Sequence, residues 1–288
     1  AADERAAEEL ATDEPAADEP AADERAAKRR RLRHATYLQE GLRYEDGRLL
    51  DAAGRGVMLG WEAPLMLRHA EALLPADSGR GLEVLNVGFG LGLVDGFLQD
   101  RRPARHHIVE AHPDVLAEMR RRGWFERGGV QVHQGRWQDV MCQLPDACLD
   151  AAFFDTWQET YVELHAFAEH LPRLLKPGGR FSFFNGLAPY SVFWHATFCR
   201  IAQEDLRDLG LSCSFLPLAL GRLGDSAWRG VAERYWQFET YYLPLATKPE
   251  RAQEDDVSPA AARDRRDLGA ADAGGAAWRP WPAAPVRV

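Results

Sequence analysis

From residue 84 to residue 245, short apolar runs alternate with longer stretches of helical periodicity. Strand-like runs lie at 84–87, 106–110, 130–133, 150–154, 180–185, 211–218 and 235–245. Helix-like stretches lie between them at 93–98, 114–122, 162–175 and 192–209. This alternation predicts an α/β fold with a doubly wound, Rossmann-like sheet of seven strands, most of them parallel. No clear helix separates the last two runs, so we expect the final strand to be antiparallel.

The pattern also predicts where the folded domain begins and ends. Mixed apolar and polar residues start near Thr36, and the pairs Asp46-Gly47 and Ala53-Gly54 indicate turns. A helix is expected to start near Pro64, which suits a first helical turn, so Glu62 would lie at a helix start. We therefore expect one domain over residues 35–250.

The two ends of the chain have a different composition. Residues 1–25 are five pentapeptides, AADER, AAEEL, ATDEP, AADEP and AADER, and residues 28–33 are the basic block KRRRLR. Such repeats bury too little apolar surface to offset the entropy of ordering, so we predict that 1–34 is disordered. Residues 251–288 are predicted to be a flexible tail with an apolar end, Trp278 to Val288.

Charge and composition limit the expected cellular location and binding partners of the protein. The net charge is −9, and residues 1–25 contribute ten acids against two arginines, so the rest of the chain is nearly neutral. No stretch reaches the roughly 18 apolar residues of a membrane span, and the four cysteines show no pairing rhythm. We expect a cytoplasmic protein with reduced thiols, no metal, no membrane and no direct nucleic-acid partner. The basic block leaves a nuclear location open.

The sharpest chemical signal is a glycine-rich turn directly after the first strand, NVGFGLG at 86–92. Glycines at alternate positions permit positive φ and a close approach of the backbone to a ligand, and the following helix would offer free N–H groups. A strand at 106–110 then ends in Glu110, about 20 residues after the turn, as expected for a carboxylate that holds a ribose. This pattern fits nicotinamide dinucleotides, flavins and S-adenosylmethionine.

Six blocks in order resemble one family: VMLGWEAPLM (57–66), NVGFGLG (86–92), IVEAHP (108–113), GRWQD (135–139), FFDT (153–156) and HLPRLLKPGG (170–179). That family is the S-adenosylmethionine-dependent guanidino-group methyltransferases. It includes guanidinoacetate N-methyltransferase and, with the closer resemblance, the fungal-type (type IV) protein arginine N5-methyltransferases. The resemblance spans about Tyr37 to Lys248.

The resemblance implies that the cofactor is S-adenosyl-L-methionine. It assigns the flanks of the cofactor to Tyr37, Met58 and Met66, the ribose to Glu110 with Ala111 and His112 beside it, and the border of the adenine to Arg136 and Trp137. The methionine part would be held by Val87, Gly88, Phe89, Gly90, Leu91, Gly92 and Leu93. For Met58, Met66 and Trp137, packing in the core is an alternative interpretation.

Glu62 and Asp155 are the expected catalytic pair. Asp155 ends an apolar strand at the sheet edge where α/β proteins bind ligands, and in the related enzymes the corresponding acids hold the substrate guanidine. Guanidinium keeps its charge near neutral pH. Two carboxylates on its terminal nitrogens would draw the positive charge toward them, and one would accept the released proton. Trp61 and Glu159 are predicted to contact the substrate as well.

The resemblance implies methyl transfer to the internal (N5) guanidino nitrogen of an arginine in a protein substrate. Guanidinoacetate enzymes carry hydroxyl residues after the Asn of the fifth strand, whereas this chain has Gly186-Leu187-Ala188-Pro189, which favours a peptide arginine. Two alternatives remain: a methyltransferase for small guanidines, and a catalytically silent module that binds S-adenosylmethionine. The closer family usually carries ankyrin-type repeats before the catalytic domain, whereas this sequence has pentapeptide repeats and a basic block there, and Trp157 stands where Tyr or Phe is usual.

Overall fold

The computed structural model describes residues 37–76, 81–157, 160–250 and 286–287. The chain divides into one unit up to Glu40 and a second, compact unit from Gly41 onward. The predicted start of the domain, residue 35, lies outside the described residues and stays a prediction. The pentapeptide repeats, the basic block and residues 251–285 lie outside the described residues.

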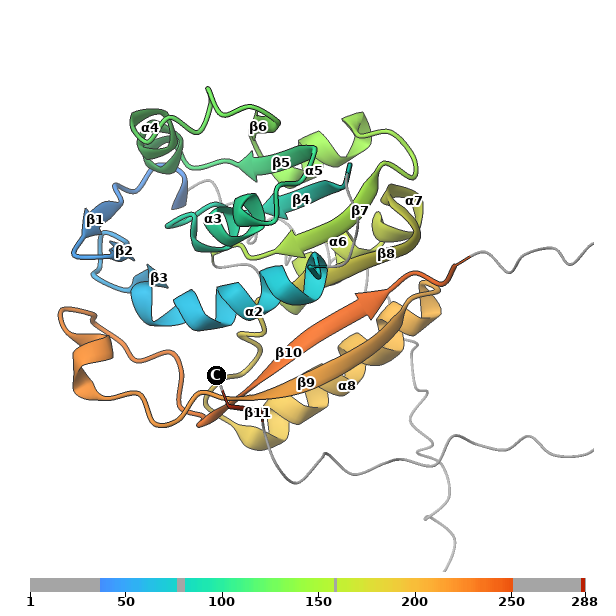
Figure 1. Cartoon of the computed structure of the whole chain (residues 1–288). Helices are drawn as coiled ribbons and strands as arrows, with labels where there is room; N and C mark the ends of the chain where they lie inside the picture. Colours follow the sequence, from blue (N-terminus) through green and yellow to red (C-terminus); the bar gives the residue numbers. More distant parts are fainter. Residues whose placement is uncertain (1–36, 77–80, 158–159, 251–285, 288) are drawn as a thin grey trace, which may run out of the picture. The chain divides into compact units, whose positions relative to one another are not determined.

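One large sheet organises the compact unit (Figure 1). Its order is β11-β9-β10-β8-β7-β4-β5-β6. The bounds are β4 Glu83–Val87, β5 Arg105–Glu110, β6 Val130–Gln134, β7 Leu149–Phe154, β8 Leu175–Phe183, β9 Ser212–Ala219, β10 Thr240–Thr247 and β11 Val286–Arg287. Strand β10 runs antiparallel to both β8 and β9, while the pairs among β4 to β8 are parallel. The seven predicted strands and the antiparallel last one are confirmed.

The structure corrects four details of the predicted elements. The run 235–245 forms a strand only from Thr240, because residues 235–239 belong to the preceding loop. The expected helix 162–175 is divided into α6 (Tyr161–Ala168) and α7 (Leu171–Leu174), with Pro172 in the first turn of α7. The strand expected at 180–185 begins at Leu175 as β8, and its pairing with β7 is irregular near this start. In the C-terminal segment, β11 pairs with Leu218 and Ala219 of β9.

Helices cover both faces of the sheet. On one face lie α2 (Ala63–Leu73), α3 (Leu93–Asp100) and α4 (Pro113–Arg121); on the other lie α5 (Trp137–Val140), α6, α7 and α8 (Val192–Asp208). Alternate residues of each strand serve the two faces, as the pleat requires. Val84 packs with α2, α3 and α4, whereas Leu85 and Val87 pack with the other helices. Both layers are therefore fixed by the period-2 pattern of the strands.

A small antiparallel sheet precedes α2 and was not predicted. It consists of β1 (Arg43–Glu45), β2 (Arg48–Leu50) and β3 (Gly56–Leu59). Asp46 and Gly47 join β1 to β2 with φ of 46° and 72°, the paired positive values of a tight hairpin turn. The expected turn at Asp46-Gly47 is thus confirmed, although three-residue strands are too short for their pattern to reveal.

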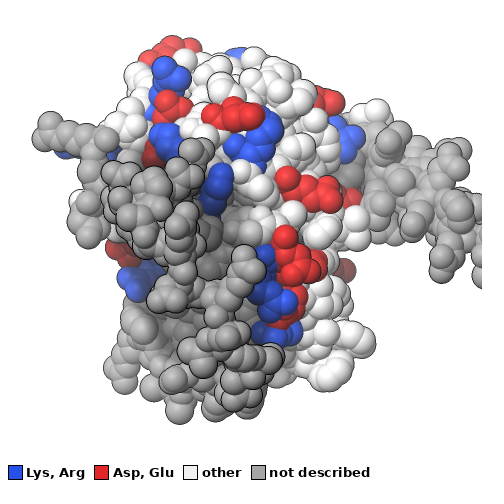
Figure 2. All heavy atoms as spheres, turned by 90° about the vertical axis from the view of Figure 1, so that its right-hand side faces the viewer, with Lys and Arg blue, Asp and Glu red and all other residues white. Residues whose placement is uncertain are grey.

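The two edges of the parallel strands differ in chemistry. The edge where these strands begin carries ion pairs, with N···O distances of 2.6 Å for Lys176–Asp150, 2.8 Å for Arg173–Asp146 and 3.5 Å for Arg105–Glu83. Figure 2 shows this face, where side chains of opposite charge lie beside one another. The opposite edge, where the strands end, holds the glycine turn and Asp155. Among the described residues, no helix is long and apolar enough to cross a bilayer.

Candidate active site

The glycine turn leaves no space for side chains. Gly88 has φ of 92°, and a Cβ there would lie 1.9 Å from the carbonyl oxygen of Asp155. Gly90 has φ of 54°, and a Cβ there would lie 2.9 Å from the sulfur of Met58. Positive φ already disfavours other residues, so both conformation and space require glycine. The turn therefore brings bare backbone to the ligand-binding edge of the sheet.

Glu110 fastens this turn to the end of β5. One carboxylate oxygen accepts the Phe89 N–H at 2.9 Å, and the other accepts the N–H groups of Ala111 and His112, each at 2.7 Å. Burial raises the pKa of Glu110, and these hydrogen bonds oppose the rise. A carboxylate has about four acceptor positions, so three N–H donors leave room for one further donor such as a ribose hydroxyl.

Three side chains from other segments contact the turn. The Tyr44 hydroxyl donates to the Gly90 carbonyl at 3.0 Å, and the Arg122 guanidinium donates to the Leu91 carbonyl at 2.7 Å. The Met58 sulfur accepts the Leu91 N–H at 3.2 Å. Of these three residues the sequence indicated only Met58. Nothing in the local pattern around Tyr44 or Arg122 marks them, because their partners lie 46 and 31 residues away in the chain.

The other predicted cofactor residues fall into three groups. Val87, Met66 and Trp137 are buried, and the Trp137 ring packs against Phe154 and Phe167 at centroid distances of 6.1 and 5.6 Å. Met66 and Trp137 thus pack in the core, and their contact with the cofactor stays a prediction. Phe89 and Leu93 lie in and after the turn, while His112 and Arg136 precede α4 and α5. Tyr37 belongs to the other unit of the chain, so its contact with the cofactor stays a prediction.

Glu62 lies immediately before α2, as predicted, and its side chain is buried. Its Oε1 accepts the Leu59 N–H at 2.7 Å and also a hydrogen bond from the Tyr235 hydroxyl. Burial, and then the negative charge of Asp155, raise its pKa from 4.5 to about 8, against the opposing effect of the Tyr235 hydrogen bond. Two donors on one oxygen hold this carboxyl group in place.

Asp155 follows β7 and is joined to β4, since its N–H donates to the Val87 carbonyl at 2.9 Å. Its Oδ2 is buried without a hydrogen-bond partner among the described residues. Burial, and then the charge of Asp95, raise the pKa of Asp155 from 3.8 to about 7. A buried carboxylate oxygen that lacks a donor is costly, and a cationic ligand would satisfy it.

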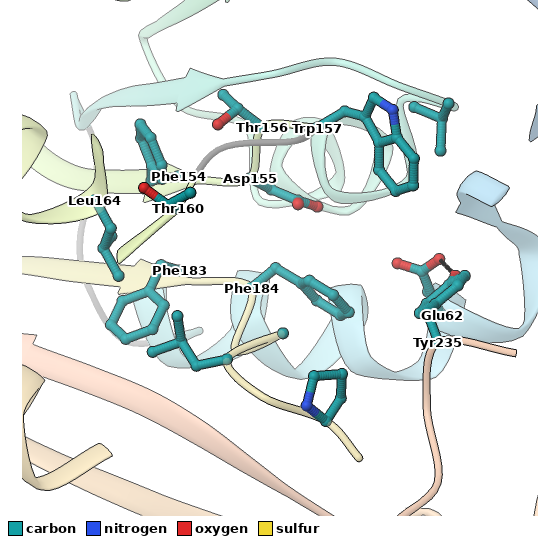
Figure 3. A pocket seen from close by; sticks show the side chains of 14 residues that line it. Glu62, Phe154, Asp155, Thr156, Trp157, Thr160, Leu164, Phe183, Phe184 and Tyr235 are labelled. Carbon is teal, nitrogen blue, oxygen red and sulfur yellow. Dashed lines mark hydrogen bonds between the residues drawn. The ribbon is translucent and has the colours of Figure 1, made fainter. Parts of the chain in front are cut away.

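Both acids line one pocket of about 220 Å³ at the ends of β7 and β8. Figure 3 shows their carboxyl groups pointing toward one another, with Trp157 and Phe184 beside them and Tyr235 against Glu62. The lining residues are Val57, Glu62, Phe154, Asp155, Thr156, Trp157, Thr160, Leu164, Phe183, Phe184, Gly186, Leu187, Pro189 and Tyr235. The structure therefore brings together the two acids that the sequence singled out.

Of the two other predicted substrate residues, the structure describes Trp61 but not Glu159. Trp61 is not among the residues that line this pocket, and its ring packs against Trp228 and Tyr235 at centroid distances of 5.6 and 5.8 Å. Its contact with the substrate stays a prediction. Glu159 lies outside the described residues, so its role stays a prediction. Tyr235 was missed because it lies 173 residues from Glu62 in the chain, in a run assigned to a strand.

Comparisons with known proteins identify the relatives of this chain. The family model of guanidinoacetate N-methyltransferase matches residues 35–203. A protein arginine N-methyltransferase 2 of Aspergillus oryzae is 43% identical over 74% of this chain and 51% of its own length. The corresponding protein of Saccharomyces cerevisiae is 36% identical over 74% of this chain and 52% of its own length. The chain thus spans about half the length of the curated relatives it matches.

The fold is also shared with a solved structure. Spermidine synthase from Thermotoga maritima superposes with a TM-score of 0.50 at 13% identity, and the match covers 72% of each chain. At this identity the likeness concerns the fold alone. The family match, in contrast, includes the glycine turn, Glu62 and Asp155 within its bounds. The chain belongs to the guanidinoacetate N-methyltransferase family.

Proposed function

We propose that this protein transfers a methyl group from S-adenosylmethionine to the internal guanidino nitrogen of an arginine in a protein substrate. The observation that carries the proposal is the pair of carboxyl groups of buried Glu62 and half-buried Asp155, in one pocket beside the glycine turn. The names of the matched relatives agree with arginine as the acceptor.

The residues around the glycine turn fit the cofactor. A turn closed to side chains at Gly88 and Gly90 offers backbone to a ligand, and Glu110 retains acceptor capacity for a ribose hydroxyl. When bound, S-adenosylmethionine supplies an electrophilic methyl group on a positively charged sulfur. The Asp155 carbonyl oxygen borders Gly88 so closely that a Cβ could not fit between them. Cofactor cradle and substrate acid are therefore adjacent.

The two acids can activate a guanidinium group. Its positive charge is delocalised over three nitrogens, which lowers the nucleophilicity of each. Carboxylates on the two terminal nitrogens draw the charge toward themselves, so that the internal nitrogen gains lone-pair character. In the ligand-free protein burial raises the pKa of Glu62 and Asp155 to about 8 and about 7. A bound guanidinium favours the charged form of both acids, and a carboxylate of this basicity can accept the proton that the substrate loses.

The lining of the pocket favours arginine within a polypeptide over guanidinoacetate. A small guanidino acid needs a partner for its own carboxylate. Among the described residues that line the pocket, none is Lys or Arg, and the segment after Asn185 contributes only Gly186, Leu187 and Pro189. A peptide arginine has no such carboxylate, so it meets this apolar wall without an unpaired charge.

Labelled methyl transfer in a cell lysate tests the proposal. The protein is incubated with S-adenosylmethionine that carries a labelled methyl group, and labelled products are identified by mass spectrometry. We expect label on arginine residues of one or a few proteins, and its loss with Asp155→Asn. Label only on small guanidino acids would support the small-molecule alternative, and no label with intact cofactor binding would support a silent binding module.

A further inference from the structure

An exposed aromatic surface adjoins the pocket. Tyr190, Val192, Phe193 and Trp194 are 70%, 73%, 69% and 53% exposed, and they lie at the start of α8. Elsewhere in the described chain, exposed large hydrophobic residues are isolated from one another along the sequence. A cluster of this kind in a soluble domain usually marks an interaction site. These four residues are called the α8 platform below.

The platform is continuous with the wall of the pocket. Gly186, Leu187 and Pro189 line the pocket, and Tyr190 follows Pro189 directly. From residue 186 to residue 199 the chain contains no Asp, Glu, Lys or Arg. A bound ligand that extends out of the pocket on this side therefore contacts an apolar, uncharged surface.

Hydrogen bonds hold the connecting segment in one conformation. The Asn185 side-chain amide donates to the Tyr242 carbonyl at 2.8 Å, and the ring of buried His195 donates to the Leu187 carbonyl. Ala188 has φ of 45°, an uncommon value for a residue with a side chain. The Ser191 hydroxyl accepts the Trp194 N–H and caps α8. A preformed surface of this kind loses little conformational entropy when it binds a partner.

We propose that the α8 platform binds the polypeptide segment that flanks the target arginine, and that this segment carries a large apolar side chain near the arginine. The proposal rests on the proposed function, because a small guanidine would be held within the pocket and would not reach the platform. Because Tyr190 directly follows Pro189 of the pocket lining, the residues next to the arginine in the substrate are the ones expected to contact Tyr190 to Trp194. The lack of charge from 186 to 199 favours apolar over charged flanking residues.

Peptide kinetics with a platform variant tests this inference. Three acceptors are compared: a peptide with Leu and Phe beside one arginine, the same peptide with Gly and Ser there, and acetylarginine amide. The variant is Phe193→Gln with Trp194→Gln, two exposed changes that leave the pocket lining intact. The matched control is Leu216→Gln, an apolar residue of β9 that is 42% exposed.

We expect the double variant to raise KM for the apolar peptide by roughly tenfold or more, the scale of losing one aromatic anchor. The kcat for this peptide and all activity on acetylarginine amide should stay unchanged, as should every parameter of Leu216→Gln. An unchanged KM for the apolar peptide would overturn the docking surface but not the proposed function. An equal loss of activity on acetylarginine amide would also overturn the docking surface. The same holds if the only change in the variant is in its self-association, measured by sedimentation. No methylation of any acceptor by the unaltered protein would overturn the proposed function, and the docking surface with it.

Discussion

Replacing Glu62 by Gln is expected to stabilise the ligand-free protein in alkaline solution while it removes most of the activity. Gln retains an oxygen that accepts from the Leu59 N–H and the Tyr235 hydroxyl, so the local structure is kept. It lacks the negative charge that binds guanidinium in the proposed reaction. Removing one charge-stabilising group from such a site typically lowers turnover by ~10²–10³. Stability and activity are thus expected to move in opposite directions.

The size of the effect follows from the pKa of Glu62, which rises from 4.5 to about 8 on folding. Between these two values the folded protein keeps a proton that the unfolded chain has released, so the free energy of unfolding falls as pH rises. The full cost, reached above pH ~8, is at most roughly 4–5 kcal/mol, since one pKa unit corresponds to about 1.4 kcal/mol. Below pH ~4.5 the carboxyl group is neutral in both states, and this contribution vanishes.

Urea unfolding at pH 5, 7 and 9 without ligands measures this difference. Glu62→Gln should match the unaltered protein near pH 5 and exceed its stability increasingly toward pH 9. Glu45→Gln, a change at a half-exposed acid, serves as the control and should show no such trend. Parallel stability curves for Glu62→Gln and the unaltered protein would refute the raised pKa and, with it, the view of Glu62 as a proton acceptor.

Three further changes test separate parts of the site. Gly90→Val should abolish binding of S-adenosylhomocysteine in calorimetry, because φ at Gly90 is 54° and a Cβ would lie 2.9 Å from the Met58 sulfur. Tight binding of NADH to the unaltered protein would contradict the cofactor assignment. Tyr235→Phe removes a hydrogen bond that lowers the pKa of Glu62. Because Glu62 is proposed to act as a carboxylate, kcat should rise with pH, and in this variant the rise should shift to higher pH. An unshifted pH profile of kcat would count against this role of Tyr235. Removing residues 1–34 should leave the melting temperature and cofactor binding unchanged, whereas a large drop would show that the repeats pack on the domain.

Much of the large sheet was predictable because its strands are apolar runs bounded by turn residues. Val84–Val87 is the clearest example: four apolar or small polar residues end at a glycine turn, and the pattern fixes both the strand and its direction. The break between α6 and α7 was missed, although Pro172 lies inside the predicted helix. The hairpin of β1 and β2 was missed because three-residue strands carry no measurable period.

The acids of the site were predictable, but their supports were not. Asp155 ends an apolar strand, and Glu62 lies just before Pro64 at a helix start, so each has a local signal. Tyr235 and Tyr44 have none, because their roles depend on hydrogen bonds to atoms 173 and 46 residues away. The burial that raises the pKa of both acids is likewise a property of the packed structure.

The product of the reaction tests the central claim most directly. Fragmentation mass spectrometry of a methylated peptide distinguishes a methyl group on the internal guanidino nitrogen from one on a terminal nitrogen. If Glu62 and Asp155 hold the two terminal nitrogens, the product is N5-monomethylarginine without dimethylated species, and Asp155→Asn lowers its yield by ~10²–10³. Asymmetric or symmetric dimethylarginine, or full activity of Asp155→Asn, would contradict the two-carboxylate site.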